Sequence, residues 1–240
     1  MKKVLCIILI SILLIATAIS ALACSDETSD AATVDPDPIG TIATWQKIYT
    51  AGDFGIRNKK DPFVEFTLST GESIRLELYP TVAPISVENF ITYVKEGFYE
   101  GTVFHRIIKG QMIQCGGFEI KEDKLVQKNA THDPIKGEFL SNGVANTLAH
   151  TRGVLSMART SDKNSATSQF FICSAKVSDW DGNYAAFGRV IDMESMAVVE
   201  RLETIKTGTE DLYYGATPYA STDVPTTRVT VKKAVLVWDK

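Results

Sequence analysis

Residue types that commonly bind metals or carry out redox chemistry are scarce in this sequence. The 240 residues include four cysteines and three histidines. His132 and His150 stand alone and show no metal-ligand spacing, so we expect neither a metal site nor a cofactor. Cys115 and Cys173 fall in the folded region, where they can form a disulfide or remain two free thiols. We favour two free thiols, with Cys173 packed as a small apolar residue.

Clusters of basic residues are also lacking. The chain has 25 lysines and arginines against 29 aspartates and glutamates, which gives a formal net charge of −4. Nucleic-acid-binding domains usually concentrate positive charge on one face, so we expect no nucleic-acid partner. The pair Gly116-Gly117 is followed by neither Lys-Ser/Thr nor a G-x-G-x-x-G pattern, so it does not predict a phosphate-binding loop.

The first 23 residues predict an export signal. Two lysines precede an apolar run from Val4 to Ala23 that is interrupted only by serine and threonine. Cys24 follows a short Ala-Leu-Ala sequence and resembles the lipid acceptor of bacterial lipoproteins. Ordinary cleavage before Cys24 and an uncleaved membrane anchor remain alternatives. All three place the protein outside the cytoplasm, and we favour a lipid anchor at Cys24 in a bacterial envelope, with secretion as the alternative.

An acidic extension separates this signal from the folded region. Residues 24–38 carry five acidic residues and no basic residue, so they bury too little to offset their ordering entropy. Apolar residues within 39–60 have a helix-like spacing of unassigned role. We therefore divide the chain into a signal peptide at 1–23, an acidic tether and extension at 24–60, and one domain at 61–240.

Short alternating segments dominate the domain. Residues 64–68 and 74–78 alternate apolar with polar residues around a Thr-Gly turn, which predicts a β-hairpin. An apolar stripe predicts a helix that begins with Ser86 as its N-cap and ends at Gly97. A second helix is expected near 193–205, followed by a loop and a last strand within 228–238. Many short strands with two helices predict a mainly β barrel or sandwich.

The segment 104–117 predicts two strands joined by Lys109-Gly110. Alternate strand residues share a face, so Phe104 and Arg106 should lie on one face and His105 on the other, packed in the core. Met112 and Gln114 share a face of the second strand, and Gln169 and Phe171 share a face of a later one. These strands side by side would present a guanidinium, two amides and aromatic rings on one surface.

Five ordered motifs resemble the cyclophilin-type peptidyl-prolyl cis-trans isomerases, in particular their bacterial branch. They are Phe104-His105-Arg106-Ile107-Ile108, Met112-Ile113-Gln114, the segment 153–158, Ser168-Gln169-Phe170-Phe171-Ile172, and Asp181-Gly182 with Phe187-Gly188. The resemblance covers residues 62–240 and implies a closed eight-stranded antiparallel barrel capped by two helices. It also implies a monomeric foldase that needs no cofactor and whose clients are proline-containing polypeptides. A cyclosporin-like ligand is implied as well.

The resemblance assigns roles to ten residues. Arg106 would donate to the prolyl nitrogen as the bond twists, and Phe104 would shield its guanidinium. Gln114 and the main chain at Ala158 and Arg159 would hold the peptide backbone. The remaining substrate-binding positions are Met112 and Phe171 for the proline ring, Gln169 beside Arg106, and Trp180 and Tyr184 on the groove wall.

Several positions depart from the family pattern. Gln111 stands where an aromatic residue is usual, Cys115 replaces a glycine, Trp180 replaces a leucine and Tyr184 replaces a histidine. Because Arg106 is kept, we expect activity with a reshaped pocket and altered cyclosporin sensitivity. The alternative is a proline-peptide-binding chaperone with weak or no turnover. A third hypothesis is a thiol enzyme that uses Cys115.

Overall fold

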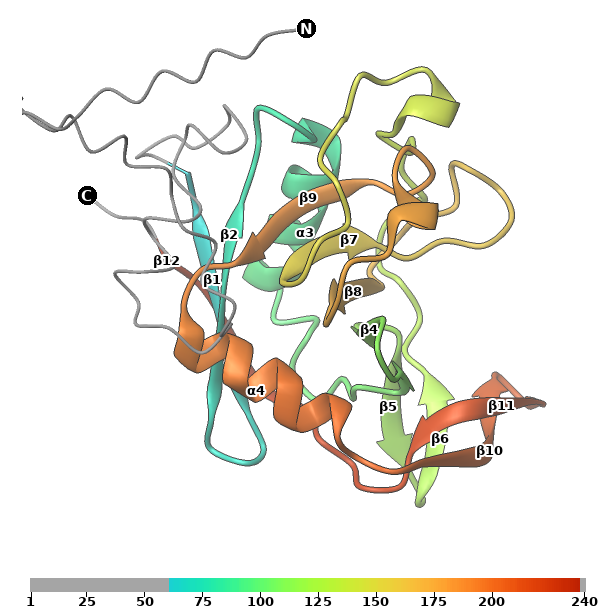
Figure 1. Ribbon diagram of the computed structural model, residues 1–240. Coiled ribbons are helices and arrows are strands. Elements are labelled where there is room, and N and C mark those ends of the chain that lie inside the picture. Colours follow the sequence, from blue (N-terminus) through green and yellow to red (C-terminus); the bar gives the residue numbers. More distant parts are fainter. Residues whose placement is uncertain (1–60, 238–240) are drawn as a thin grey trace, which may run out of the picture. The chain divides into compact units, whose positions relative to one another are not determined.

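The computed structural model describes residues 61–237 (Figure 1). The export signal at 1–23, the tether and extension at 24–60, and Cys24 lie outside the described residues, and the statements made about them stay predictions.

Eight antiparallel strands form one curled sheet in the order β12-β1-β2-β9-β7-β8-β4-β3. This architecture confirms the prediction of a mainly β fold with two helices. In chain order, the strands are β1 (Phe63–Leu68), β2 (Ser73–Leu78), β3 (Arg106–Ile108), β4 (Met112–Cys115), β7 (Val154–Met157), β8 (Phe170–Cys173), β9 (Ala186–Val190) and β12 (Val231–Val237).

The ends of this sheet approach each other without forming a strand pair. Within the described residues, the end strands β12 and β3 are not neighbours in the sheet. The segments that lead into them do meet, because Val103 bridges Thr230 and the N–H of Phe104 donates to the carbonyl of Val229 at 3.0 Å. The hydrogen bonding therefore establishes a curled sheet, a coarser result than the closed barrel that was expected.

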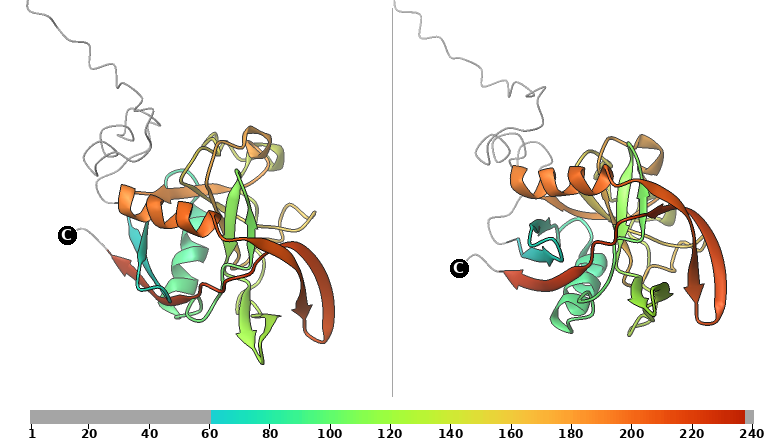
Figure 2. Two further views of the ribbon diagram at one scale, coloured as in Figure 1. Left: turned by 60° about the horizontal axis from the view of Figure 1, so that its bottom comes forward. Right: turned by 90° about the horizontal axis from the view of Figure 1, so that it is seen from below.

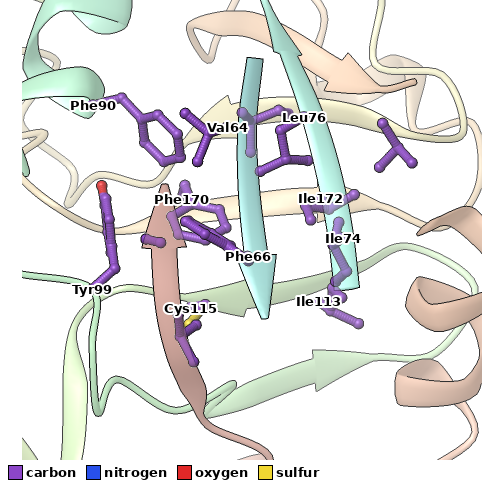
Figure 3. Close-up of a cluster of buried hydrophobic side chains, with 14 of the residues drawn as sticks. Val64, Phe66, Ile74, Leu76, Phe90, Tyr99, Ile113, Cys115, Phe170 and Ile172 are labelled. Carbon is purple, nitrogen blue, oxygen red and sulfur yellow. The ribbon is translucent and has the colours of Figure 1, made fainter. Parts of the chain in front are cut away.

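The inner face of the sheet builds the core. The predicted alternation of the first hairpin is confirmed, since every second residue of β1, from Val64 to Leu68, is fully buried. Figure 3 shows the aromatic rings that meet there. The ring centroids of Phe66 and Phe170 are 5.6 Å apart, and those of Phe90 and Phe170 are 5.4 Å apart. Such tilted and edge-on pairs are the favoured aromatic arrangement.

Among residues 61–237, two α-helices pack on the sheet, α3 (Pro84–Lys95) and α4 (Met193–Glu203). Helix α3 begins two residues before the predicted cap at Ser86, because the carboxylate of Glu138 accepts from the N–H groups of Ile85 and Ser86 at 3.1 and 2.7 Å. Helix α4 begins after Asp192, whose side chain accepts from the N–H of Ser195. In residues 61–237, no helix has the length and apolar character needed to cross a membrane.

A second sheet lies beside strand β3. It contains β5 (Phe118–Lys121), β6 (Lys124–Gln127), β10 (Thr207–Tyr214) and β11 (Thr217–Pro225) in the order β11-β10-β6-β5. Figures 1 and 2 show β10 and β11 as one long hairpin next to the green strands. The sequence predicted a loop here, and that prediction is wrong. The hairpin forms because Leu212 and Val224 are buried against Phe118.

Candidate active site

The strand register brings the three central site residues into one row. Arg106 on β3 lies opposite Gln114 on β4, and Gln114 lies opposite Phe171 on β8. Ser156 on β7 continues the row beside Phe171. Directly opposed residues in an antiparallel pair have Cβ atoms about 4.5–5.5 Å apart. A cation, an amide and an aromatic ring therefore stand side by side on one surface.

A cavity of about 110 Å³ opens on this surface. Eight of the ten residues singled out in the sequence line it: Arg106, Met112, Gln114, Ala158, Arg159, Phe171, Trp180 and Tyr184. Gln111 is exposed at the β3–β4 turn and does not line the cavity. The cavity thus combines an apolar wall with a small number of polar groups, the usual composition of a ligand site.

Phe104 does not lie on the expected face. It is 1% exposed and belongs to the main core together with Ile107. Strand β3 begins only at Arg106, so the two-residue alternation does not extend back to Phe104. The structure therefore places the Phe104 ring in the core and not on the solvent-facing surface that was expected. His105, which was predicted to pack inside, does so and contacts the Phe118 ring at a centroid distance of 4.6 Å.

Gln169 supports Gln114, and within residues 61–237 no hydrogen bond joins it to Arg106. The Nε2 group of Gln114 donates to Oε1 of Gln169 at 2.9 Å. Gly117 makes room for this arrangement, since a Cβ atom there would lie 2.3 Å from Cδ of Gln169. Because Nε2 of Gln114 is held in this hydrogen bond, the rotation of its side-chain amide is restricted.

Arg106 is held by a residue that the sequence analysis missed. Its Nε and Nη2 atoms donate to Oδ2 of Asp223 at 3.3 and 3.4 Å. The side chains of Arg106 and Asp223 are 42% and 34% exposed, so this is a partly solvated ion pair. Asp223 lies on β11, 117 residues away in the sequence, and no local pattern could have predicted the contact.

The cavity wall is an aromatic cluster on the loop after β8. The centroid of the Trp180 ring lies 5.0 Å from that of Phe171, with a 71° angle between the rings. Tyr184 lies 5.7 Å from Phe171 in an edge-on arrangement. Trp180 therefore forms part of the wall and leaves the cavity open.

Arg159 stabilises this wall through its guanidinium. The guanidinium carbon lies 4.6 Å from the centroid of the Tyr184 ring and 5.2 Å from that of Phe139. Its Nη2 donates to the carbonyl of Asn183 at 2.8 Å, and the N–H of Ala158 donates to the carbonyl of Gln169 at 3.0 Å. The guanidinium of Arg159 thus fastens two loops around the cavity.

His150 is a second residue whose place the sequence analysis missed. Its ring stacks on Phe171 at a centroid distance of 5.9 Å. Nδ1 lies 3.0 Å from Oδ1 of Asp181, and Nε2 lies 3.0 Å from Oγ of Ser156. Burial lowers the pKa of His150, although Asp181 opposes this effect. A neutral ring would donate from Nδ1 and accept the Ser156 proton at Nε2, which ties the cavity floor to the wall loop.

This Ser-His-Asp arrangement does not create a nucleophile. Ser156 has no solvent exposure and lies on β7 beside Phe171.

Cys115 is equally buried, and burial raises the pKa of its thiol to about 12, so the thiol-enzyme hypothesis is wrong. Both Cys115 and Cys173 are free thiols, as favoured from the sequence. In the described part of the chain, no group of three or more His, Cys, Asp or Glu side chains is arranged to hold a metal.

Comparisons with known proteins agree with this geometry. The family model described as "Cyclophilin type peptidyl-prolyl cis-trans isomerase/CLD" matches residues 63–235. A peptidyl-prolyl cis-trans isomerase of Acinetobacter baylyi is 47% identical over 155 residues, which cover 62% of this chain and 76% of that protein. Peptidyl-prolyl cis-trans isomerase B of Escherichia coli is 38% identical over 160 residues, with 62% and 89% covered.

A solved structure supports the fold. The crystal structure of a Cryptosporidium parvum cyclophilin-type peptidyl-prolyl cis-trans isomerase, obtained in the presence of the dipeptide Ala-Pro, superimposes with a TM-score of 0.56. The superposition covers 73% of this chain and 98% of that chain, at 24% sequence identity. At this identity, the likeness demonstrates a shared fold.

Proposed function

Because this chain belongs to the cyclophilin-type peptidyl-prolyl cis-trans isomerase family, it is an isomerase of X-Pro peptide bonds, and we propose that Arg106 is its catalytic residue. The observation that carries this proposal is the row of Arg106, Gln114 and Phe171 along an open cavity. The row offers a charged donor, a backbone-binding amide and an apolar surface at neighbouring positions.

The chemistry of this reaction requires no nucleophile. Rotation about the X-Pro bond is slow because it breaks amide resonance, with a barrier of about 18–20 kcal/mol. The twisted bond leaves a lone pair on a pyramidal prolyl nitrogen. A site accelerates the rotation if it binds this twisted state better than the planar one. Arg106 suits this task because its guanidinium keeps its charge and its donors are already in place.

The other cavity residues bind the substrate. Met112, Phe171 and Trp180 offer the apolar surface for a proline ring. Gln114, held by Gln169, would hydrogen-bond the peptide backbone next to the rotating bond. The C. parvum structure obtained with Ala-Pro supports proline-containing peptides as the substrate class of this fold. Polypeptide clients with exposed X-Pro bonds are therefore the proposed substrates.

The setting proposed for this activity is extracytoplasmic. The Lys2-Lys3 start, the apolar run and Cys24 support export and lipid anchoring to a bacterial membrane. The proposed molecule is a monomer that folds exported proteins, with a cyclosporin-like compound as a candidate ligand of the same cavity. Closure of the sheet into a complete barrel is also proposed, supported by the Val103–Thr230 bridge.

Replacement of Arg106 by alanine in the full chain tests the mechanism. A protease-coupled assay with a proline-containing peptide should show kcat/KM reduced about a hundredfold or more, the usual effect of removing a preorganised donor. Arg201→Ala is the matched control, since Arg201 lies on α4 and forms an exposed ion pair with Glu72 of the β1–β2 turn, and it should behave as wild type. An Arg106→Ala protein as active as wild type would reject the mechanism. If the wild-type protein binds the peptide but does not accelerate its isomerisation, the chaperone alternative is favoured.

A further inference from the structure

We propose that Asp223 is a positioning residue that orients the guanidinium of Arg106 for isomerisation. This inference rests on the proposed function of Arg106. The ion pair is side-on, because both Nε and Nη2 of Arg106 donate to one oxygen of Asp223. Within the described residues, Nη1 makes no hydrogen bond, so the far end of the guanidinium remains available to a substrate in the cavity that Arg106 lines.

The backbone on both sides of this ion pair is anchored in one apolar cluster. Val224, next to Asp223, is 1% exposed and packs with Phe118 and Leu212. On the other side of the ion pair, His105 directly precedes Arg106 and β3, and it is buried against the ring of the same Phe118. The two strands therefore hold their charged residues at a defined separation before any substrate arrives.

The hairpin that carries Asp223 is itself fixed. Strand β10 pairs with β6, and the ring of Tyr214 meets Phe118 edge-on at a centroid distance of 5.3 Å. Arg228 also forms an ion pair with Glu210 of this hairpin. Because the hairpin is held at several points, Asp223 is a rigid partner for the long and otherwise flexible side chain of Arg106.

The physical gain is a reduction of side-chain freedom. A half-exposed arginine samples several rotamers, and ordering it in the transition state is unfavourable. A carboxylate on the Nε edge selects one orientation in advance, which should raise kcat more than it changes substrate binding. An exposed ion pair contributes little energy, so the expected effect of Asp223 is about two- to fivefold in kcat.

Asp223→Asn tests this role, with Asp223→Glu and Asp211→Asn as companions. Asp211 is an exposed acid of the same hairpin, and its side chain has no hydrogen bond or ion pair among the described residues, so Asp211→Asn matches the change in charge. We expect Asp223→Asn to lower kcat about two- to fivefold with KM changed less. Asp223→Glu should recover part of the loss, and Asp211→Asn should equal wild type.

A salt titration provides a readout that a purely structural role would not alter. The screening length falls from about 30 Å at 0.01 M salt to about 3 Å at 1 M. Wild-type kcat should therefore decline toward the value of Asp223→Asn as salt rises, while that of the variant stays nearly constant. The decline of wild-type kcat with salt is measured on wild type alone and does not depend on the folding of a variant.

The results separate this inference from the function of Arg106. In an Arg106→Ala background, Asp223→Asn should have no further effect, because the two residues act as one unit. If Arg106→Ala is inactive while Asp223→Asn equals or exceeds wild type in kcat, the positioning role is refuted and the catalytic role stands. If Arg106→Ala retains full activity, the catalytic role itself fails.

Discussion

Replacement of His105 should remove a large part of the acid sensitivity of this domain. His105 is 2% exposed and contacts Phe118. Burial lowers its pKa to about 4, and the charge of Arg106 adds to this effect, whereas the backbone of Val103 opposes it. The folded state therefore keeps His105 neutral under conditions in which the unfolded chain already binds a proton.

The size and sign of the effect follow from this difference. An unfolded histidine has a pKa near 6.5, so the folded value of about 4 lies roughly 2.5 units lower. Since one unit corresponds to about 1.36 kcal/mol, the neutral form contributes on the order of 3 kcal/mol. That contribution is complete above pH 6.5 and is lost as the pH falls toward 4. For comparison, the total free energy of unfolding of a typical domain is about 5–15 kcal/mol.

Urea unfolding of wild type and His105→Phe at several pH values between 7 and 4 measures this contribution. Phenylalanine keeps a ring against Phe118 but cannot bind a proton. Between pH 7 and pH 4, the free energy of unfolding of His105→Phe should therefore fall by about 3 kcal/mol less than that of wild type. A difference between wild type and His105→Phe that does not vary with pH would refute the reasoning.

Two further substitutions test the cavity by activity measurements. Gly117→Ala places a Cβ atom 2.3 Å from Cδ of Gln169, so the Gln114–Gln169 hydrogen bond should be lost and kcat/KM should fall about fivefold, the value of one hydrogen bond. Gly208→Ala is the control and should retain wild-type activity, because the nearest atom to its new Cβ is 4.0 Å away. A Gly117→Ala protein with wild-type kcat/KM would contradict the role of Gln169. Phe171→Leu removes the aromatic contacts with Trp180 and Tyr184 and should raise KM about two- to tenfold; an unchanged KM would exclude Phe171 from the proline site.

The features that the sequence predicted correctly depend on neighbours within a few residues. Alternation along β1 and β2 predicted the buried face of the first hairpin, and a two-residue period predicted that Arg106 and Gln114 face the solvent side. Strand parity is local, because each Cβ direction follows from the one before it. The same local order makes the motifs of the family recognisable without a structure.

Local parity failed where the strand itself ended. Phe104 was expected beside Arg106, but β3 starts at Arg106 and Phe104 turns into the core. The segment 207–225 was predicted to be a loop because its threonine, glycine and tyrosine residues show no clear hydrophobic periodicity. Packing of Leu212 and Val224 against Phe118 makes it a hairpin, and a contact of this kind overrides local propensity.

By itself, the sequence determined the fold class, the family and most of the cavity lining, since these follow from patterns along single strands and from motif order. The tertiary structure decided which residues support the site. Asp223 reaches Arg106 across 117 residues, and His150 joins Ser156 to Asp181 beneath Phe171. These contacts arise because separate elements pack against one another, and no local pattern in the intervening sequence predicts which distant residues will meet.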